Sequence, residues 1–215
     1  MGAFCVAAML LCYVASMKYT SAANAIVLEY TAPVFILVFE MLFFHKKPDR
    51  KDLIVCLAVF AGICIVVSDS LGKGNLKGDL IALASGVFYA FTIMLNDFEN
   101  GDPLSSVFFG HLFTAIYGLF FVVRQADMSM GTVLLVIALG IFQAGAGYTL
   151  LTIGLKKSEA LPASLIASIE PVLNPILVAL FYGEKVSGRT LIGAFIVIAS
   201  IVVYNILSIK SDQEV

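Results

Sequence analysis

The chain has 215 residues, of which 60% are hydrophobic and 13% are charged, and its formal net charge is −2. Soluble domains carry roughly 25% charged residues, so this composition, with a mean hydropathy of +1.00, indicates a membrane protein. The small net charge and the single short basic cluster, HKKPDRK, exclude a nucleic-acid-binding surface.

Eight apolar runs, separated by charged residues or by Gly, Pro and Asn, predict eight transmembrane helices. They cover residues 2–17, 22–44, 51–68, 78–96, 104–123, 130–154, 160–183 and 188–208. Runs of about 20 residues suit helices that cross a hydrocarbon core of roughly 30 Å, whereas barrel strands are shorter and alternate in polarity. We therefore expect an all-α membrane protein whose short connections leave no room for a separate catalytic domain.

The basic residues predict the orientation of these helices, because short cytoplasmic loops are enriched in Lys and Arg. The loop at residues 45–52 contains Lys46, Lys47, Arg50 and Lys51, which places it in the cytoplasm. With eight helices, both termini then also lie in the cytoplasm, and the protein is expected in the cell membrane.

The sequence matches itself without gaps when it is shifted by 138 residues. Residues 2–65 align with residues 140–203, and about a quarter of the aligned positions are identical. Apolar residues match one another by chance, so the informative pairs are those of lysines and proline. These pairs are Lys18 with Lys156, Lys47 with Lys185, and Pro33 with Pro171.

The shift relates helices that are five spans apart, so the two copies enter the membrane from opposite sides. Such inverted repeats are typical of secondary transporters, whose binding sites lie near the membrane midplane between the halves. We predict a partial first repeat of three helices in residues 1–70 and a second repeat of five helices in residues 77–209. Because residues 78–123 have no earlier counterpart, the first repeat is expected to lack two helices.

Several longer segments carry a family resemblance. GDLIALASGVFYAFTIML and EPVLNPILVALFYGEKVSGRTLIGAFIVIASIVV resemble the second half of an EamA-type transporter of the drug/metabolite transporter superfamily. YTSAANAIVLEYTAPVFILV and DLIVCLAVFAGICIVV resemble the same elements of the first half, although His45 and Lys46 stand where the family commonly has Gly and Glu. The resemblance covers nearly the whole chain and implies amino acids, metabolites or drugs as substrates.

The stretch SIEPVLNP places a carboxylate and two prolines inside an apolar run. Glu170 lies about 15 Å into its predicted helix, near the midplane, where a charge must face a cavity or a partner. Pro171 and Pro175 remove two backbone donors, and Asn174 shares the helix face of Glu170. We interpret Glu170, Pro171 and Asn174 as substrate-binding residues; the alternative is a kinked helix whose polar groups pair with neighbouring helices.

The first repeat offers a related set of residues. Glu29 and Pro33, four residues apart, are interpreted as lining the same path, and a salt bridge of Glu29 to Lys18 is the alternative. Glu40 is expected to pair with the basic loop, and Asn24 to cap a helix start.

Further polar residues lie within apolar runs. Tyr89, Gln143 and Tyr148 are predicted to offer hydrogen bonds to a polar substrate, with packing alone as the alternative. His111 is considered as a proton relay with Glu170, because a histidine gains and loses a proton near neutral pH; its alternative is a hydrogen bond between helices. Small residues at 82–86 and 140–147 predict close helix approach, and Glu184 is expected to make an end contact.

The sequence contains no nucleotide-binding loop and no HExxH motif, and its four cysteines all lie in apolar runs. We therefore expect no cofactor, no metal site and no enzyme activity. The preferred function is secondary transport, such as efflux, of a small organic solute by alternating access through a central polar cavity. The alternatives are a channel or a truncated, non-transporting membrane component. The expected partners are the solute and the lipid bilayer, and a homodimer is left open.

Overall fold

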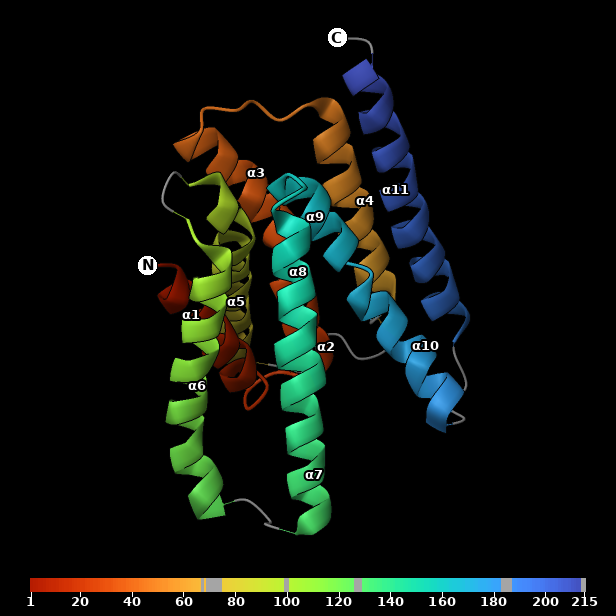
Figure 1. Ribbon diagram of the computed structural model, residues 1–215. Coiled ribbons are helices and arrows are strands. Elements are labelled where there is room, and N and C mark those ends of the chain that lie inside the picture. Colours follow the sequence, from red (N-terminus) through yellow and green to blue (C-terminus); the bar gives the residue numbers. More distant parts are fainter. Residues whose placement is uncertain (67, 69–74, 99–100, 126–128, 183–186, 214–215) are drawn as a thin grey trace.

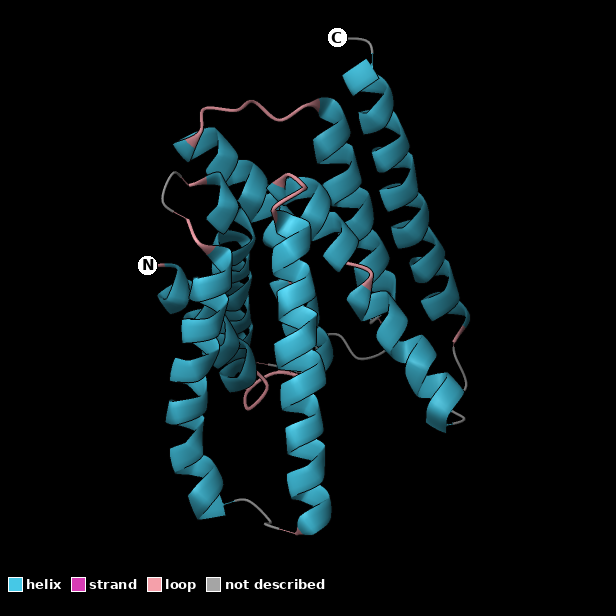
Figure 2. Ribbon diagram, viewed as in Figure 1, coloured by secondary structure: helices cyan, strands magenta, loops and turns pink. Residues whose placement is uncertain are grey.

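The computed structural model describes residues 1–66, 68, 75–98, 101–125, 129–182 and 187–213. These residues form helices joined by short loops, and they include no strand (Figure 2), which confirms the predicted all-α architecture. In chain order the elements are α1 (Gly2–Ser16), α2 (Ala22–Glu29), α3 (Ala32–Phe43), α4 (Arg50–Val66), α5 (Leu76–Ile93), the 3₁₀ turn η1 (Met94–Asp97), α6 (Pro103–Gln125), α7 (Met130–Leu139), the π-helix η2 (Gly140–Gly147), α8 (Tyr148–Leu155), α9 (Ala160–Ala167), α10 (Glu170–Tyr182) and α11 (Gly188–Gln213) (Figure 1).

Five segments of the described chain are long and apolar enough to cross a membrane. They are Asn24–Phe43, Leu76–Ile93, Pro103–Phe120, Met130–Leu155 and Gly188–Leu207. The other three predicted spans correspond to α1, with 15 residues, to α4, with 17 residues, and to the interrupted pair α9 and α10. The structure therefore agrees with a multi-pass membrane protein.

Two of the predicted helices are interrupted. Residues 22–44 form α2 and α3, which are separated by Tyr30 and Thr31. Residues 160–182 form α9 and α10, which are separated by Ser168 and Ile169. A kink was the alternative interpretation of the second of these helices, and the structure shows a two-residue interruption in both, at which Thr31 and Ser168 keep right-handed helical backbone angles.

A proline explains each interruption. Pro33 and Pro171 have no backbone N–H, so neither can donate to the carbonyl oxygen four residues earlier, which belongs to Glu29 and to Ala167. These two residues are the last of α2 and of α9. Each proline instead lies in the first turn of the next helix. The N–H groups of a first turn have no acceptor within the helix, so a proline there costs no hydrogen bond.

The backbone hydrogen bonds after the two interruptions follow one pattern. The N–H of Val34 donates to the oxygen of Thr31 at 2.9 Å, and the N–H of Val172 donates to the oxygen of Ile169 at 3.0 Å. The second pair lies 138 residues after the first (172 − 34), which is the shift at which the sequence matches itself.

The helices pack in two groups that α2, α3 and α9 connect. α4 lies along α11, where a Cβ on Gly193 would stand 2.6 Å from the carbonyl oxygen of Gly62. α1 lies between α5 and α6 and contacts both (Figure 1). α3 contacts both α5 and α9, so the first broken helix is packed against the second.

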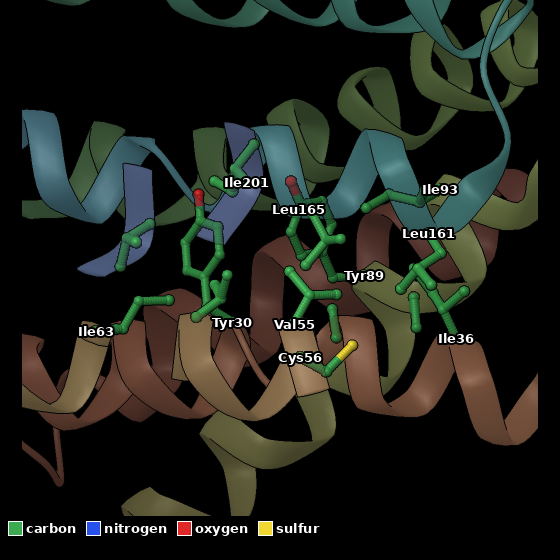
Figure 3. Close-up of a cluster of buried hydrophobic side chains, with 14 of the residues drawn as sticks. Tyr30, Ile36, Val55, Cys56, Ile63, Tyr89, Ile93, Leu161, Leu165 and Ile201 are labelled. Atoms are coloured by element: carbon green, nitrogen blue, oxygen red, sulfur yellow. The ribbon is translucent and has the colours of Figure 1, made fainter. Parts of the chain in front are cut away.

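Buried side chains of α3, α5 and α9 pack in one cluster. Leu161 and Leu165 of α9 pack with Ile36 of α3 and Ile93 of α5 in this cluster, and Ile36 and Leu165 are 0% exposed (Figure 3). Branched apolar side chains that interdigitate in this way exclude water from the contact between α3 and α9.

The long helix formed by α7, η2 and α8 has little cover. No residue of α7 or η2 is buried. Gly2 of α1 packs tightly against Ser106, whereas Gly140, its counterpart in the self-match, has no neighbouring atom within 4 Å of where a Cβ would stand. The close helix approach predicted for residues 140–147 is therefore wrong for the described structure.

The close approach predicted for residues 82–86 is confirmed at Gly86. A Cβ there would lie 2.7 Å from the carbonyl oxygen of Leu28 and 2.9 Å from that of Glu29. The absence of a side chain on Gly86 thus allows the broken end of α2 to lie directly against α5.

We predict that Gly86→Ala lowers the thermal unfolding temperature of the detergent-purified protein, because backbone atoms must move to admit the methyl group, at a cost of about 1–3 kcal/mol. Gly118→Ala is the matched control, since Gly118 lies within α6 and a methyl group there would meet no other atom within 4 Å. Equal unfolding temperatures for the two variants would contradict the close contact.

Candidate functional site

A cavity of about 540 Å³ lies where the two broken helices face α1, α5 and the η2–α8 segment. This volume is within the range of small-molecule sites. Its lining comprises Met9, Leu10, Tyr13, Ile26, Glu29, Tyr30, Tyr89, Gln143, Gly147, Tyr148, Leu151, Ala167, Glu170 and Pro171. The lining combines apolar walls with two carboxylates, four tyrosines and one amide.

The interruptions supply the most polar part of this lining. Glu29 is the last residue of α2 and Tyr30 is the first residue of the break, while Ala167 ends α9 and Glu170 begins α10. Both interruptions therefore open onto one cavity, and each contributes one carboxylate to it.

A hydrogen bond joins the two interruptions. The hydroxyl of Tyr30 donates to Oε2 of Glu170 at 2.8 Å, across 140 residues of sequence. The Tyr30 ring also meets the Tyr89 ring edge to face, with 6.0 Å between centroids, which fixes its direction (Figure 3). A hydrogen bond to a charged acceptor contributes about 1.5–3 kcal/mol, so this contact holds the first broken helix against the second.

The two carboxylates differ in their surroundings. Glu170 begins α10, where the positive end of the helix dipole stabilises a negative charge, and it accepts the Tyr30 bond. Glu29 ends α2, where the dipole opposes a negative charge. No described residue donates a hydrogen bond to the Glu29 side chain or forms an ion pair with it, and the predicted alternative of a Lys18 salt bridge is absent from this part of the chain.

The π-helix η2 carries the opposite wall. Gln143 and Gly147 of η2 line the cavity together with Tyr148, the first residue of α8. π-Helical turns inside α-helices are frequent at functional sites. Here the π-helical turn carries Gln143, whose amide side chain lines the cavity that also contains Glu29 and Glu170.

His111 lies behind this wall. Its ring meets the Tyr148 ring edge to face, with 4.5 Å between centroids, and its Nδ1 lies 2.9 Å from the carbonyl oxygen of Val107 in the same helix. His111 does not line the cavity. The structure therefore shows no direct contact between His111 and Glu170.

Six of the eight predicted substrate-binding residues line one cavity. They are Glu29, Tyr89, Gln143, Tyr148, Glu170 and Pro171. Pro33 is buried in the first turn of α3, outside the lining. The side chain of Asn174 and the residue Glu184 lie outside the part of the chain that the structure describes.

The predictions for two other polar residues had different outcomes. Glu40 pairs with Lys46, with 3.6 Å between Oε1 and Nζ, as expected. Asn24 does not cap α2, because the side chain of Ser21 accepts the bond from the Asn24 N–H. The Asn24 amide instead donates to Oδ1 of Asp79 at 3.2 Å, next to a 2.6 Å bond from Thr20, and so ties α2 to α5.

We predict that Tyr30→Phe and Glu170→Gln are energetically coupled. In a double-mutant cycle on thermal unfolding, their coupling should be about 1 kcal/mol, because the glutamine amide oxygen still accepts a bond and the cycle measures only the gain from a charged acceptor. The control cycle combines Glu170→Gln with Tyr148→Phe, a cavity tyrosine with no described hydrogen bond to Glu170. A coupling of zero in the first cycle would contradict the bond between the interruptions.

Comparison with known proteins relates this fold to membrane transporters. The chain is 23% identical over 209 residues to an "Uncharacterized transporter" of Clostridium kluyveri, covering 88% of this chain and 66% of the relative. It is 27% identical over 193 residues to an "Uncharacterized transporter" of Archaeoglobus fulgidus, covering 89% and 69%. It is also 25% identical over 211 residues to human "Solute carrier family 35 member G1", covering 90% and 57%. The chain thus spans about two thirds of the length of the first two relatives.

A solved crystal structure has the same fold, with a TM-score of 0.80 over 97% of this chain and 76% of that chain. The two sequences are 19% identical, so the match shows the fold alone. The model of the EamA-like transporter family matches residues 1–68 and 76–206, which is most of the sequence. This protein is therefore a multi-pass membrane protein that belongs to the EamA-like transporter family.

Proposed function

We propose that the protein is a carrier that moves a small organic solute, such as an amino acid, a metabolite or a drug, by alternating access through the cavity. The observation that carries this proposal is the Tyr30–Glu170 hydrogen bond, which joins two broken helices at the cavity. Broken helices are tolerated at membrane depth where they are buried in protein or line a cavity. In many secondary transporters such helices form the substrate site.

The proposed architecture is two inverted repeats, residues 1–70 and 77–209, with eight membrane-crossing segments. The equal hydrogen-bond pattern after the two interruptions supports it, because Thr31 and Val34 correspond to Ile169 and Val172 at the shift of 138 residues. Pairing of the first broken helix with the second, through α3 and α9, also supports it. In this proposal the two repeats move against each other about the cavity.

We infer that the buried side chains around Ile36 and Leu165 close one end of the cavity. In this proposal the structure represents a state that is open away from the α3–α4 loop. With that basic loop and both termini in the cytoplasm, the open end faces outward.

A second candidate is a non-transporting component of a larger assembly. The observation in its favour concerns the long apolar segment Met130–Leu155. In the most apolar stretch of this segment, 0% of the residues are buried inside the molecule. Solute counterflow in proteoliposomes separates the candidates. A carrier gives saturable uptake that unlabelled solute on the opposite side accelerates, a channel gives uptake that does not saturate, and an assembly component gives none.

We predict that Glu170→Gln lowers the transport rate about tenfold or more, equivalent to about 1.4 kcal/mol, and leaves expression unchanged. The substitution keeps the shape of the side chain and removes its charge from the cavity. Initial rates of uptake into proteoliposomes measure the effect, and Glu159→Gln, an exposed carboxylate at the start of α9, is the control. Unchanged kinetics for Glu170→Gln would remove this residue from the solute path.

A further inference from the structure

The cavity lining is acidic. Among the described residues it contains the carboxyl groups of Glu29 and Glu170 and no lysine, arginine or histidine. The ion pairs found among the described residues, Lys46 with Glu40 and Lys51 with Asp49, both lie outside it. A carboxylate in a site of low dielectric needs a proton or a cation to offset its charge.

The remaining walls suit an organic cation. The rings of Tyr13, Tyr30, Tyr89 and Tyr148 all line the cavity. A cation over an aromatic face gains about 0.5–2 kcal/mol, with the larger value where water is excluded. The hydroxyls and the Gln143 amide oxygen can accept hydrogen bonds from an ammonium group, so donors on the solute also find partners.

We propose that the solute is a small organic cation with an apolar body, whose charged group lies against Glu29. This inference rests on the proposed function and names the substrate class of the same cavity. Glu29 is the principal partner because no described residue donates to its carboxylate, whereas Glu170 is already bonded to Tyr30. An anion is disfavoured by the two acidic side chains, and a neutral solute would leave Glu29 to be offset by a proton alone.

Binding to the purified full chain in detergent tests this inference without requiring transport. The probes are 2-phenylethylammonium, 2-phenylethanol and phenylacetate, which have similar size and differ in charge. A second pair is tetraphenylphosphonium and tetraphenylborate, which have nearly the same shape and opposite charge. Isothermal titration calorimetry should show at least a tenfold preference for a cation over the neutral or anionic probe of the same shape.

The variants locate the charge that causes this preference. Glu29→Gln should reduce cation affinity tenfold or more, and Glu170→Gln should reduce it by a smaller factor. Glu159→Gln, which removes an exposed carboxylate outside the cavity, should leave it unchanged. The affinity for 2-phenylethanol should stay the same or rise in Glu29→Gln, because its polar site then carries no charge.

Three results would overturn the inference: no binding of either cation, equal binding of the probes within a set, or a cation preference that survives in both cavity variants. The transport proposal fails separately. Counterflow of a neutral or anionic solute would keep the carrier and reject the cation. Cation binding that depends on Glu29 in a protein without counterflow would keep the cation site and reject the carrier.

Discussion

The structure depends on one constraint, which is that backbone polar groups in a membrane must find partners within the protein. Pro33 and Pro171 each remove a donor that a continuous helix would need, and α2 and α9 end at the carbonyls that lose it. Both interruptions lie inside the protein, in contact with neighbouring helices. Gly86 lets the end of α2 rest on α5, and α3 packs on α9.

The interruptions also place charge at membrane depth. A charged side chain there is costly unless it faces water or a partner. Glu29 and Glu170 satisfy this condition because they stand at the edges of the breaks, where the chain turns toward the cavity rather than toward lipid. The Tyr30–Glu170 bond links the two interruptions at the cavity. In the proposed transport cycle, a motion that widens the cavity would strain or break this bond.

Much of the fold and part of the site could be predicted from the sequence. Apolar runs predict helices because the bilayer offers no other partner for the backbone, and polar residues within those runs gather for the same reason; Glu29, Tyr89, Gln143 and Glu170 illustrate this. Tyr30 was missed, although Ile26, Glu29 and Tyr30 have the i, i+3, i+4 spacing of one helix face and all three line the cavity.

One predicted residue, Pro33, lies outside the cavity lining. In a continuous helix Pro33 would share a face with Glu29, four residues earlier. Because Pro33 begins a new helix, its ring is buried in α3 instead. The π-helical turn that aims Gln143 into the cavity was also beyond prediction, since its composition of Gly and Ala equally suits close packing against another helix.

The central claim is that the two interruptions meet around a cavity that is open to water at one end. Its most direct test is the reactivity of single cysteines toward a membrane-impermeant thiol reagent, in a variant that lacks the four native cysteines and is reconstituted in vesicles. The account predicts that Gln143→Cys reacts from one side of the membrane and that Leu165→Cys, in the closed end, does not react. If Gln143→Cys is inert from both sides, or if the two positions react equally, the account is contradicted.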